Sequence, residues 1–161
     1  VGLRAWSQRL SPVEQRLVGS WMVARSELNT PVMQQWEFSA DRTFRSTEYQ
    51  WDPVERKWMK SSPNYVYNKG SWKIEGNLLS FRGERPAGQK LYSSAIRLYN
   101  QLTGRTAFDP FIDHGTLKVQ DDGSLLFRFW WESKNDYGPP ITLVRGTIDD
   151  VRRRPEDFPP D

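Results

Sequence analysis

The stretch WEFSADRTFRSTEYQW, residues 36–51, decides the fold class, because apolar and polar side chains alternate on both sides of a short turn. Before the turn, Trp36 and Phe38 fall on one face of an extended chain, with Glu37 on the other. The turn residues ADRT lead straight into a second alternating segment, 43–51. Two such segments joined so closely predict an antiparallel β-hairpin.

The same alternation recurs on both sides of this hairpin, with turn residues between the runs. About eight or nine short strands result, and such spacing is typical of an antiparallel barrel or sandwich. Most consecutive strands are joined by short turns, so we expect an all-β, up-and-down antiparallel barrel of about eight strands, whose closure removes exposed strand edges. The further runs are SWMVARSEL (20–28), SWKIE (71–75), LLSFRG (78–83), TLKVQ (116–120), SLLFRFWWE (124–132) and ITLVRGT (141–147).

Two segments do not follow this pattern. KLYSSAIRLYNQL (90–102) suits a helix by the spacing of its apolar residues and a strand by its composition, so both remain open. GRTAFDPFIDHG (104–115) is expected to be a long loop.

A short helix is predicted before the first strand, within LSPVEQRLVG (10–19). Ser11 suits the N-cap, Pro12 the first helical position and Glu14 the capping-box position. Gly19 ends the helix and begins the strand.

The 161 residues suit one domain with an extension at either end. We expect the barrel over 10–147, an extension or membrane-anchor stub over 1–9, and a polar tail over 148–161, which either begins with a short helical turn or is loosely held throughout. The region 58–67 reads as an insertion at one end of the barrel, or a lid. The start VGL precedes RAWSQR, which fits either the remnant of a signal peptide or membrane tether, or an arbitrary boundary.

Composition narrows the classes of function. Eight Trp, eight Phe and six Tyr can fill a core. With 23 basic and 20 acidic residues, the charge does not favour nucleic acid, even though FRFWW (127–131) interleaves arginine with aromatic rings. There is no cysteine and His114 is the only histidine, so the sequence predicts no cysteine or two-histidine metal site, no nucleophile triad and no cofactor.

Several of these segments resemble the motifs of one family. A short helix followed by Gly19-Ser20-Trp21 resembles the opening of lipocalins and the wider calycin group. WEFSADRTF (36–44) resembles the W-x-F-x-x-D-G-T-F hairpin of bacterial lipocalin-like domains, with Arg42 where glycine is usual. GSWKIEGNLLSF (70–81) and ITLVRG (141–146) resemble later segments of the same domains. The resemblance implies an extracytoplasmic protein, periplasmic or membrane-anchored.

The resemblance also implies a structural signature of Gly19, Trp21 and Arg145. Trp21 would close one end of the barrel, and Arg145, on the same strand face as Leu143, would pack over its indole by a cation–π contact. The alternative is that Trp21 is an ordinary core residue and Arg145 lies in solvent. Arg42 requires either another turn geometry or some strain, since glycine at that position supplies a positive φ.

A barrel of eight strands has room for side chains or for one small ligand. The expected function is therefore non-catalytic binding of a small apolar or amphipathic ligand, and the alternative is a packed structural or protein-interaction barrel without a ligand. The residues expected to line the cavity are Trp36, Phe38, Phe44, Glu48, Trp72, Phe81, Phe127 and Phe129.

An enzyme is the third class considered. It would need Glu48, Asp113 or His114 gathered in the pocket with a shifted pKa. If Phe44 points inward, Glu48 does so too, since residues two or four apart share a strand face. Arg97 and Arg128 fit the outer surface better than a polar cavity.

Overall fold

The computed structural model describes residues 9–25, 32–61, 69–83, 98–99, 101–103 and 112–153. Helix α1 spans Pro12–Leu17 and helix α3 spans Ile148–Arg153. The strands are β1 (Gly19–Arg25), β2 (Val32–Phe38), β3 (Thr43–Asp52), β4 (Lys57–Lys60), β5 (Lys69–Glu75), β6 (Leu78–Gly83), β7 (Ile112–Val119), β8 (Leu125–Trp131), β9 (Asp136–Tyr137) and β10 (Ile141–Arg145).

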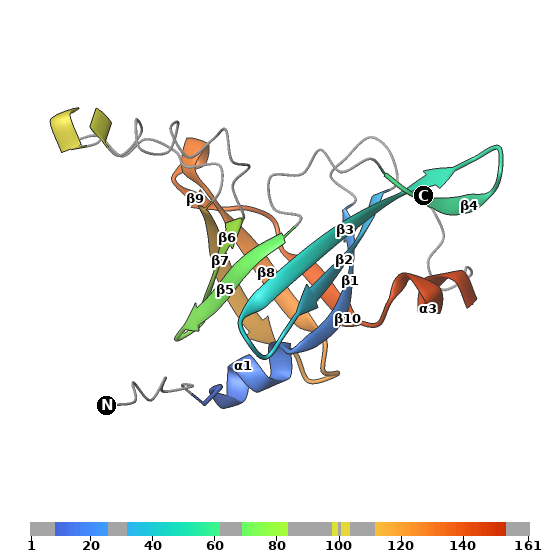
Figure 1. Cartoon of the computed structure of the whole chain (residues 1–161), viewed down its shortest axis with the longest axis horizontal. Helices are drawn as coiled ribbons and strands as arrows, with labels where there is room; N and C mark the ends of the chain where they lie inside the picture. Colours follow the sequence, from blue (N-terminus) through green and yellow to red (C-terminus); the bar gives the residue numbers. More distant parts are fainter. Residues whose placement is uncertain are drawn as a thin grey trace, which may run out of the picture.

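Eight strands of the described chain close into an antiparallel barrel in the order β1-β2-β3-β5-β6-β7-β8-β10 (Figure 1). Closure comes from β10, which pairs with β8 on one side and with β1 on the other. The short strands β4 and β9 pair with β3 and β8 and lie outside this ring. The predicted fold class is confirmed, including the short helix before the first strand.

The register fixes which side chains point into the barrel. Trp21 lies opposite both Trp36 and Arg145, and Trp36 lies opposite Ser46. Two residues further along β3, Glu48 lies opposite Gln34 and therefore faces the interior, as strand alternation predicts from Phe44.

The interior is packed by a single cluster of buried side chains, most of them aromatic or branched aliphatic. Apolar residues at alternate positions explain why the strands form where they do, because every second side chain of a barrel strand points into the interior. The buried members are Leu17, Trp21, Val23, Trp36, Phe38, Phe44, Trp72, Leu79, Phe81, Leu117, Leu125, Phe127, Ile141 and Leu143.

A second apolar cluster, which we call the outer cluster, lies outside the barrel wall. It joins Met22 of β1 and Met33 of β2 to Trp58 of β4 and to Ile148 and Val151 of α3. Figure 1 shows α3 beside β1 and β10, on the outside of the barrel. The outer cluster explains why Met22 and Met33 are buried although their neighbours in sequence face the interior.

Two expectations need correction here. The tail from residue 148 was expected to be polar and, in one alternative, loosely held throughout, but 148–153 form a helix packed on the barrel, because Ile148 and Val151 cover the apolar side chains of the outer cluster. The segment 104–115 was expected to be one long loop, but β7 begins at Ile112 and pairs with β6.

The described residues cover the remaining expectations only in part. Of the region 58–67, the first residues belong to β4, and 62–68 lie outside the described residues. Residues 98–99 and 101–103 are helical, which favours the helical alternative for that part of 90–102. The extension 1–8 and the tail from 154 onward lie outside the described residues.

Candidate functional site

One end of the barrel is closed by α1. The helix has a complete capping box: the backbone N–H of Ser11 donates to Glu14 Oε2 at 2.7 Å, and the N–H of Glu14 donates to Ser11 Oγ at 3.3 Å. Leu17, on the same helix, is fully buried in the barrel cluster. The capping residues therefore set the position of an apolar plug.

Trp21 and Arg145 complete this closed end. The Trp21 side chain is 1% exposed and its Nε1 donates to the carbonyl of Leu17 at 2.7 Å. The Arg145 guanidinium carbon lies 4.3 Å from the centre of the Trp21 ring, and its Nη atoms donate to the carbonyls of Val18 (3.1 Å) and Arg16 (2.7 Å). The predicted contact is therefore present, and the Arg145 side chain makes it while remaining exposed to solvent.

Gly19 lies directly under the Arg145 guanidinium. Its φ is +132°, a backbone region that glycine alone adopts readily, and a Cβ there would collide with Nη1 of Arg145. Glycine at this position therefore lets the arginine reach the last carbonyls of α1.

The middle of the barrel is filled by aromatic rings. Trp36 packs edge-on against Phe81 at 5.6 Å between ring centres, and Phe81 packs against Phe44 (5.2 Å) and Phe127 (5.8 Å). These contacts have the edge-to-face geometry that aromatic rings prefer. Six residues expected to line a cavity are buried and belong to the barrel cluster: Trp36, Phe38, Phe44, Trp72, Phe81 and Phe127.

The interior becomes polar toward the end opposite α1. Here Trp36 Nε1 donates to Gln34 Oε1 at 3.1 Å, and Gln34 Nε2 donates to Glu48 Oε2 at 3.3 Å. Ser61 Oγ donates to Glu48 Oε1 at 3.1 Å, and the Ser61 backbone N–H donates to the Glu48 carbonyl. We call Trp36, Gln34, Glu48 and Ser61 the polar relay.

Two further side chains belong to this end of the interior. Phe129 is half-buried and packs against Phe127 (4.7 Å) and Trp36 (6.0 Å), so it adds an apolar surface next to the polar relay. Asp113 is half-buried and lies opposite the inward-facing Phe81 in the β6–β7 register. Polar and apolar interior side chains therefore meet at this depth.

Gln34 is the residue that sequence analysis missed. It is only 5% exposed, and it shares the strand face of Trp36 and Phe38, so the alternation in residues 32–38 contained the signal. A glutamine in an otherwise apolar interior requires hydrogen-bond partners, and the polar relay supplies them.

His114 does not join Asp113 in the interior. Neighbouring strand residues point to opposite faces, and the ring of His114 lies on the outside, nearly parallel to that of Trp130 with 6.1 Å between centres. The Asp113/His114 pair considered for an enzyme is therefore not formed by these side chains. Arg128 is also on the outside, where its Nε donates to the carbonyl of Gly138 at 2.9 Å, and Arg97 lies outside the described residues.

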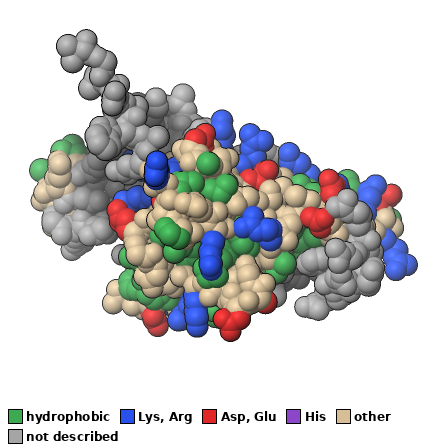
Figure 2. Space-filling model, turned by 90° about the horizontal axis from the view of Figure 1, so that it is seen from below, with side chains coloured by type: hydrophobic (Ala, Val, Ile, Leu, Met, Phe, Trp, Pro, Cys, Tyr) green, Lys and Arg blue, Asp and Glu red, His purple; other side chains and the backbone are tan. Residues whose placement is uncertain are grey.

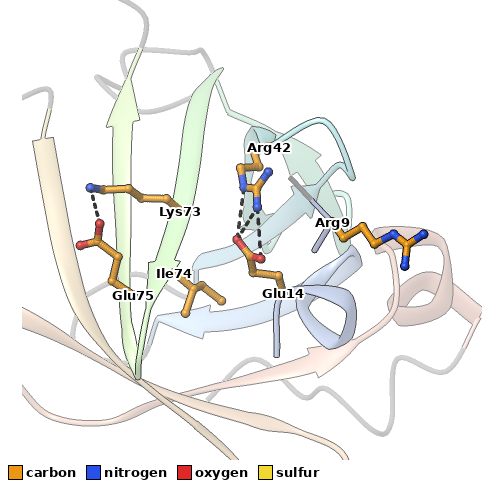
Figure 3. Close-up of a pocket in the computed structure, with 6 residues that line it drawn as sticks. All are labelled: Arg9, Glu14, Arg42, Lys73, Ile74 and Glu75. Atoms are coloured by element: carbon orange, nitrogen blue, oxygen red, sulfur yellow. Dashed lines mark hydrogen bonds and ion pairs between the residues drawn. The ribbon is translucent and has the colours of Figure 1, made fainter. Parts of the chain in front are cut away.

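A pocket of about 520 Å³ lies beside α1 (Figure 3). Glu14 and Arg42 form an ion pair at its centre with N···O 3.0 Å, while Lys73 pairs with Glu75 and Arg9 points away from both pairs. Burial alone would raise the pKa of Glu14, but the Ser11 N–H and the Arg42 guanidinium together hold that pKa below its ordinary value of 4.5. Four of the five charges that line this pocket are therefore paired with one another.

A smaller pocket of about 350 Å³ lies at the same closed end, lined by Trp21, Arg145, Arg16 and the β7–β8 turn. Figure 2 shows the surface at this end of the molecule, where basic and acidic side chains are interspersed with hydrophobic ones. Among the described residues drawn in colour there, charges of both signs occur side by side.

The described residues contain neither a grouped set of metal ligands nor a membrane-spanning helix. Within 9–25, 32–61, 69–83, 98–99, 101–103 and 112–153, no three His, Cys, Asp or Glu side chains are grouped to hold a metal ion. The helices found in these ranges are all too short or too polar to span a bilayer.

A scan of the chain against protein-family models gives no match, and neither does a search of curated proteins. The closed eight-stranded antiparallel barrel is consistent with a lipocalin-like fold.

Proposed function

We propose that this protein binds a small amphipathic ligand, without catalysis, at the end of the barrel opposite α1. The observation that carries the proposal is the change along the interior, from packed aromatic rings to the hydrogen-bonded polar relay. An amphipathic ligand matches this change, with its apolar part against Phe129 and Trp36 and its polar part at Glu48.

In this proposal the ligand enters the barrel interior only from the end opposite α1. The other end is occupied by Leu17, Trp21 and the Arg145 guanidinium, and the middle by aromatic rings in mutual contact. This arrangement moves the expected ligand contacts away from Phe38, Phe44 and Trp72 and toward Glu48 and Phe129.

We also propose that the chain is a bacterial, lipocalin-like, calycin-type protein and that it works outside the cytoplasm. Support for the family comes from the order of the resembling motifs together with the closed barrel and the Trp21–Arg145 contact. The proposed location outside the cytoplasm is supported by the resemblance.

A packed structural or protein-interaction barrel is the second candidate. It is favoured by the tight contacts among the six buried rings, which leave the middle of the barrel to the protein's own side chains. In that case the polar relay would serve only to satisfy buried polar groups.

Binding of N-phenyl-1-naphthylamine, a neutral dye that fluoresces in apolar surroundings, tests the proposal. The full chain should give saturable, one-to-one binding, and native mass spectrometry of gently purified protein should reveal a bound small molecule. Ser46→Phe places bulk on the interior face of β3 and should abolish dye binding, whereas Arg45→Phe, on the outer face, should not.

Circular dichroism of Ser46→Phe and Arg45→Phe is the control, and both variants should keep the β-sheet spectrum of the unmodified chain. Saturable binding that is equal in both variants would place the dye elsewhere and contradict the proposed site. The absence of saturable binding in the unmodified chain would favour the packed barrel.

A further inference from the structure

The smaller pocket, of about 350 Å³, lies at the closed end of the barrel, away from the end proposed for the amphipathic ligand. Three charged side chains line it: Arg16 from the last turn of α1, Arg145 from the end of β10, and Asp121 from the turn between β7 and β8. The buried side chains of Trp21 and Leu125 line it as well. The pocket therefore combines two guanidinium groups and one carboxylate with an apolar surface.

The Arg145 guanidinium is already oriented where it lines this pocket. It lies 4.3 Å from the centre of the Trp21 ring, and its two Nη atoms donate to the carbonyls of Val18 and Arg16. These hydrogen bonds engage two of its five N–H groups, so within the described chain three N–H groups of this exposed side chain have no protein acceptor. An arginine that is held in place loses little conformational freedom when it binds an anion.

Arg16 adds a second positive charge to the pocket. Its side chain is exposed, and among the described residues it forms neither a hydrogen bond nor an ion pair. The exposed carboxylate of Asp121 also has no such contact within the described ranges, so it neutralises neither arginine directly. The larger pocket beside α1 differs in this respect, because Glu14 and Arg42 are paired there. The side chains that line the smaller pocket therefore leave a net charge of +1.

We propose that this pocket binds the carboxylate of a small organic acid that has an apolar body. A planar carboxylate accepts two parallel hydrogen bonds from a guanidinium, and such charge-assisted bonds are stronger than neutral ones. Its single negative charge matches the net charge of the lining side chains. Its apolar body contacts Val119, which is half-buried in the same pocket beside Leu125. The site is separate from the barrel interior and does not depend on the function proposed above.

The same geometry disfavours a cationic ligand. A ligand ammonium would lie beside the charges of Arg16 and Arg145, with only Asp121 to attract it. Among compounds that share a benzene ring, the expected order of affinity is therefore benzoate, then benzyl alcohol, then benzylammonium. Acetate should bind more weakly than benzoate, because it has the carboxylate but no ring to contact Val119.

Isothermal titration calorimetry of the full chain at low ionic strength tests this order. Benzoate should bind about tenfold more tightly than benzylammonium, and added sodium chloride should weaken benzoate binding. Arg16→Gln should weaken benzoate binding about threefold or more, because it removes one of the two guanidinium groups. Asp121→Asn should strengthen benzoate binding about twofold, because it removes the negative charge that repels the acid.

Arg82→Gln is the matched control for Arg16→Gln. It removes the same charge from an exposed residue of β6 that lies opposite Ile112, at the far end of β7 from the pocket, and it should leave benzoate binding unchanged. Nuclear magnetic resonance then locates the acid: benzoate should shift the indole N–H signal of Trp21 and the amide signal of Gly123, which also lines the pocket.

Three outcomes would overturn the proposal. The first is equal affinity for benzoate and benzylammonium in the unmodified chain, and the second is equal benzoate affinity in Arg16→Gln and Arg82→Gln. The third is a set of benzoate-induced shifts centred on Glu48 and Phe129, which would place the acid in the barrel interior. If Arg16→Gln does not fold, the order of affinity in the unmodified chain and the effect of Asp121→Asn decide the matter.

Discussion

The carboxylate of Glu14 lies 3.0 Å from Nη2 of Arg42, 28 positions further along the chain, and this contact ties α1 to the β2–β3 turn. Arg42 adopts a φ of +65°, the left-handed region in which glycine is favoured. The turn thus keeps the backbone shape that glycine would give, at a cost in backbone strain at Arg42. The Arg42 guanidinium binds the capping-box carboxylate of the helix.

Glu14 should make stability depend on pH. Its pKa is lowered in the folded protein, so its contribution is complete above the ordinary value of 4.5 and is lost as the pH falls through the lower folded pKa. We expect Glu14→Gln to lower the free energy of unfolding by about 1–2 kcal/mol at pH 7. Urea denaturation at several pH values should show this difference shrinking below pH 4.5, and a constant difference would contradict the role of the ion pair.

Two substitutions of Arg42 separate the cost of backbone strain from the contribution of the ion pair to stability. Arg42→Ala loses the contact with Glu14 and keeps a side chain in the left-handed region, whereas Arg42→Gly loses the contact but relieves the backbone. The alanine variant should therefore be less stable than the glycine variant by about 1 kcal/mol. Thermal denaturation of both variants measures this difference, and equal stability would mean that the turn changes shape when arginine is removed.

Replacement of Gly19 by alanine should disturb the closed end. The new Cβ would collide with Nη1 of Arg145 in addition to straining the backbone, so we expect a loss of about 2–3 kcal/mol. Gly123→Ala is the matched control, because Gly123 also has a positive φ but has open space around it, and it should cost about 1 kcal/mol. Urea denaturation compares the two, and equal losses would exclude a contribution from the collision.

Arg145→Lys should weaken the end cap although it keeps the charge. An ammonium cannot reproduce the planar cation–π contact with Trp21 together with hydrogen bonds to the carbonyls of Val18 and Arg16. The expected loss is about 1–2 kcal/mol in the free energy of unfolding. Arg128→Lys is the control on the outer face, where the arginine also donates to backbone carbonyls but is paired with no indole.

Substitution of Val151 tests whether the packing of α3 on the barrel contributes to the stability of the protein. Its side chain is fully buried in the outer cluster, so Val151→Ala should cost about 2 kcal/mol. Val144→Ala makes the same chemical change at a side chain that is 44% exposed and should cost less than about 1 kcal/mol. A tail that is only loosely attached would give equal, small losses for both variants.

Strand alternation and the order of the motifs together predicted the barrel, because alternate apolar side chains give each strand one face that points inward. The inward position of Glu48 followed from Phe44 by the same rule, and the Trp21–Arg145 contact followed from the resemblance. The position of Glu48 and the Trp21–Arg145 contact could both be predicted without deriving which distant strands pair.

Features that depend on packing between distant segments could not be predicted in this way. From the sequence, Met22 is an outer-face residue of a strand and Ile148 begins a polar tail. Only the packing of α3 and β4 on the barrel buries the two side chains in one cluster. The aromatic residues were expected to line a cavity, but whether large rings line a space or fill it depends on the barrel's diameter and their rotamers, which alternation does not contain.

The pairing of the first barrel strand with the last has a consequence for biosynthesis. Arg145 donates to the carbonyl of Val18 across 127 positions, so β1 has no partner on that side until β10 has left the ribosome. At translation speeds of roughly 5–20 residues per second, that delay is on the order of ten seconds. During this interval the nascent chain exposes an unpaired β-edge and an uncapped indole, which are the features that chaperones shield from aggregation.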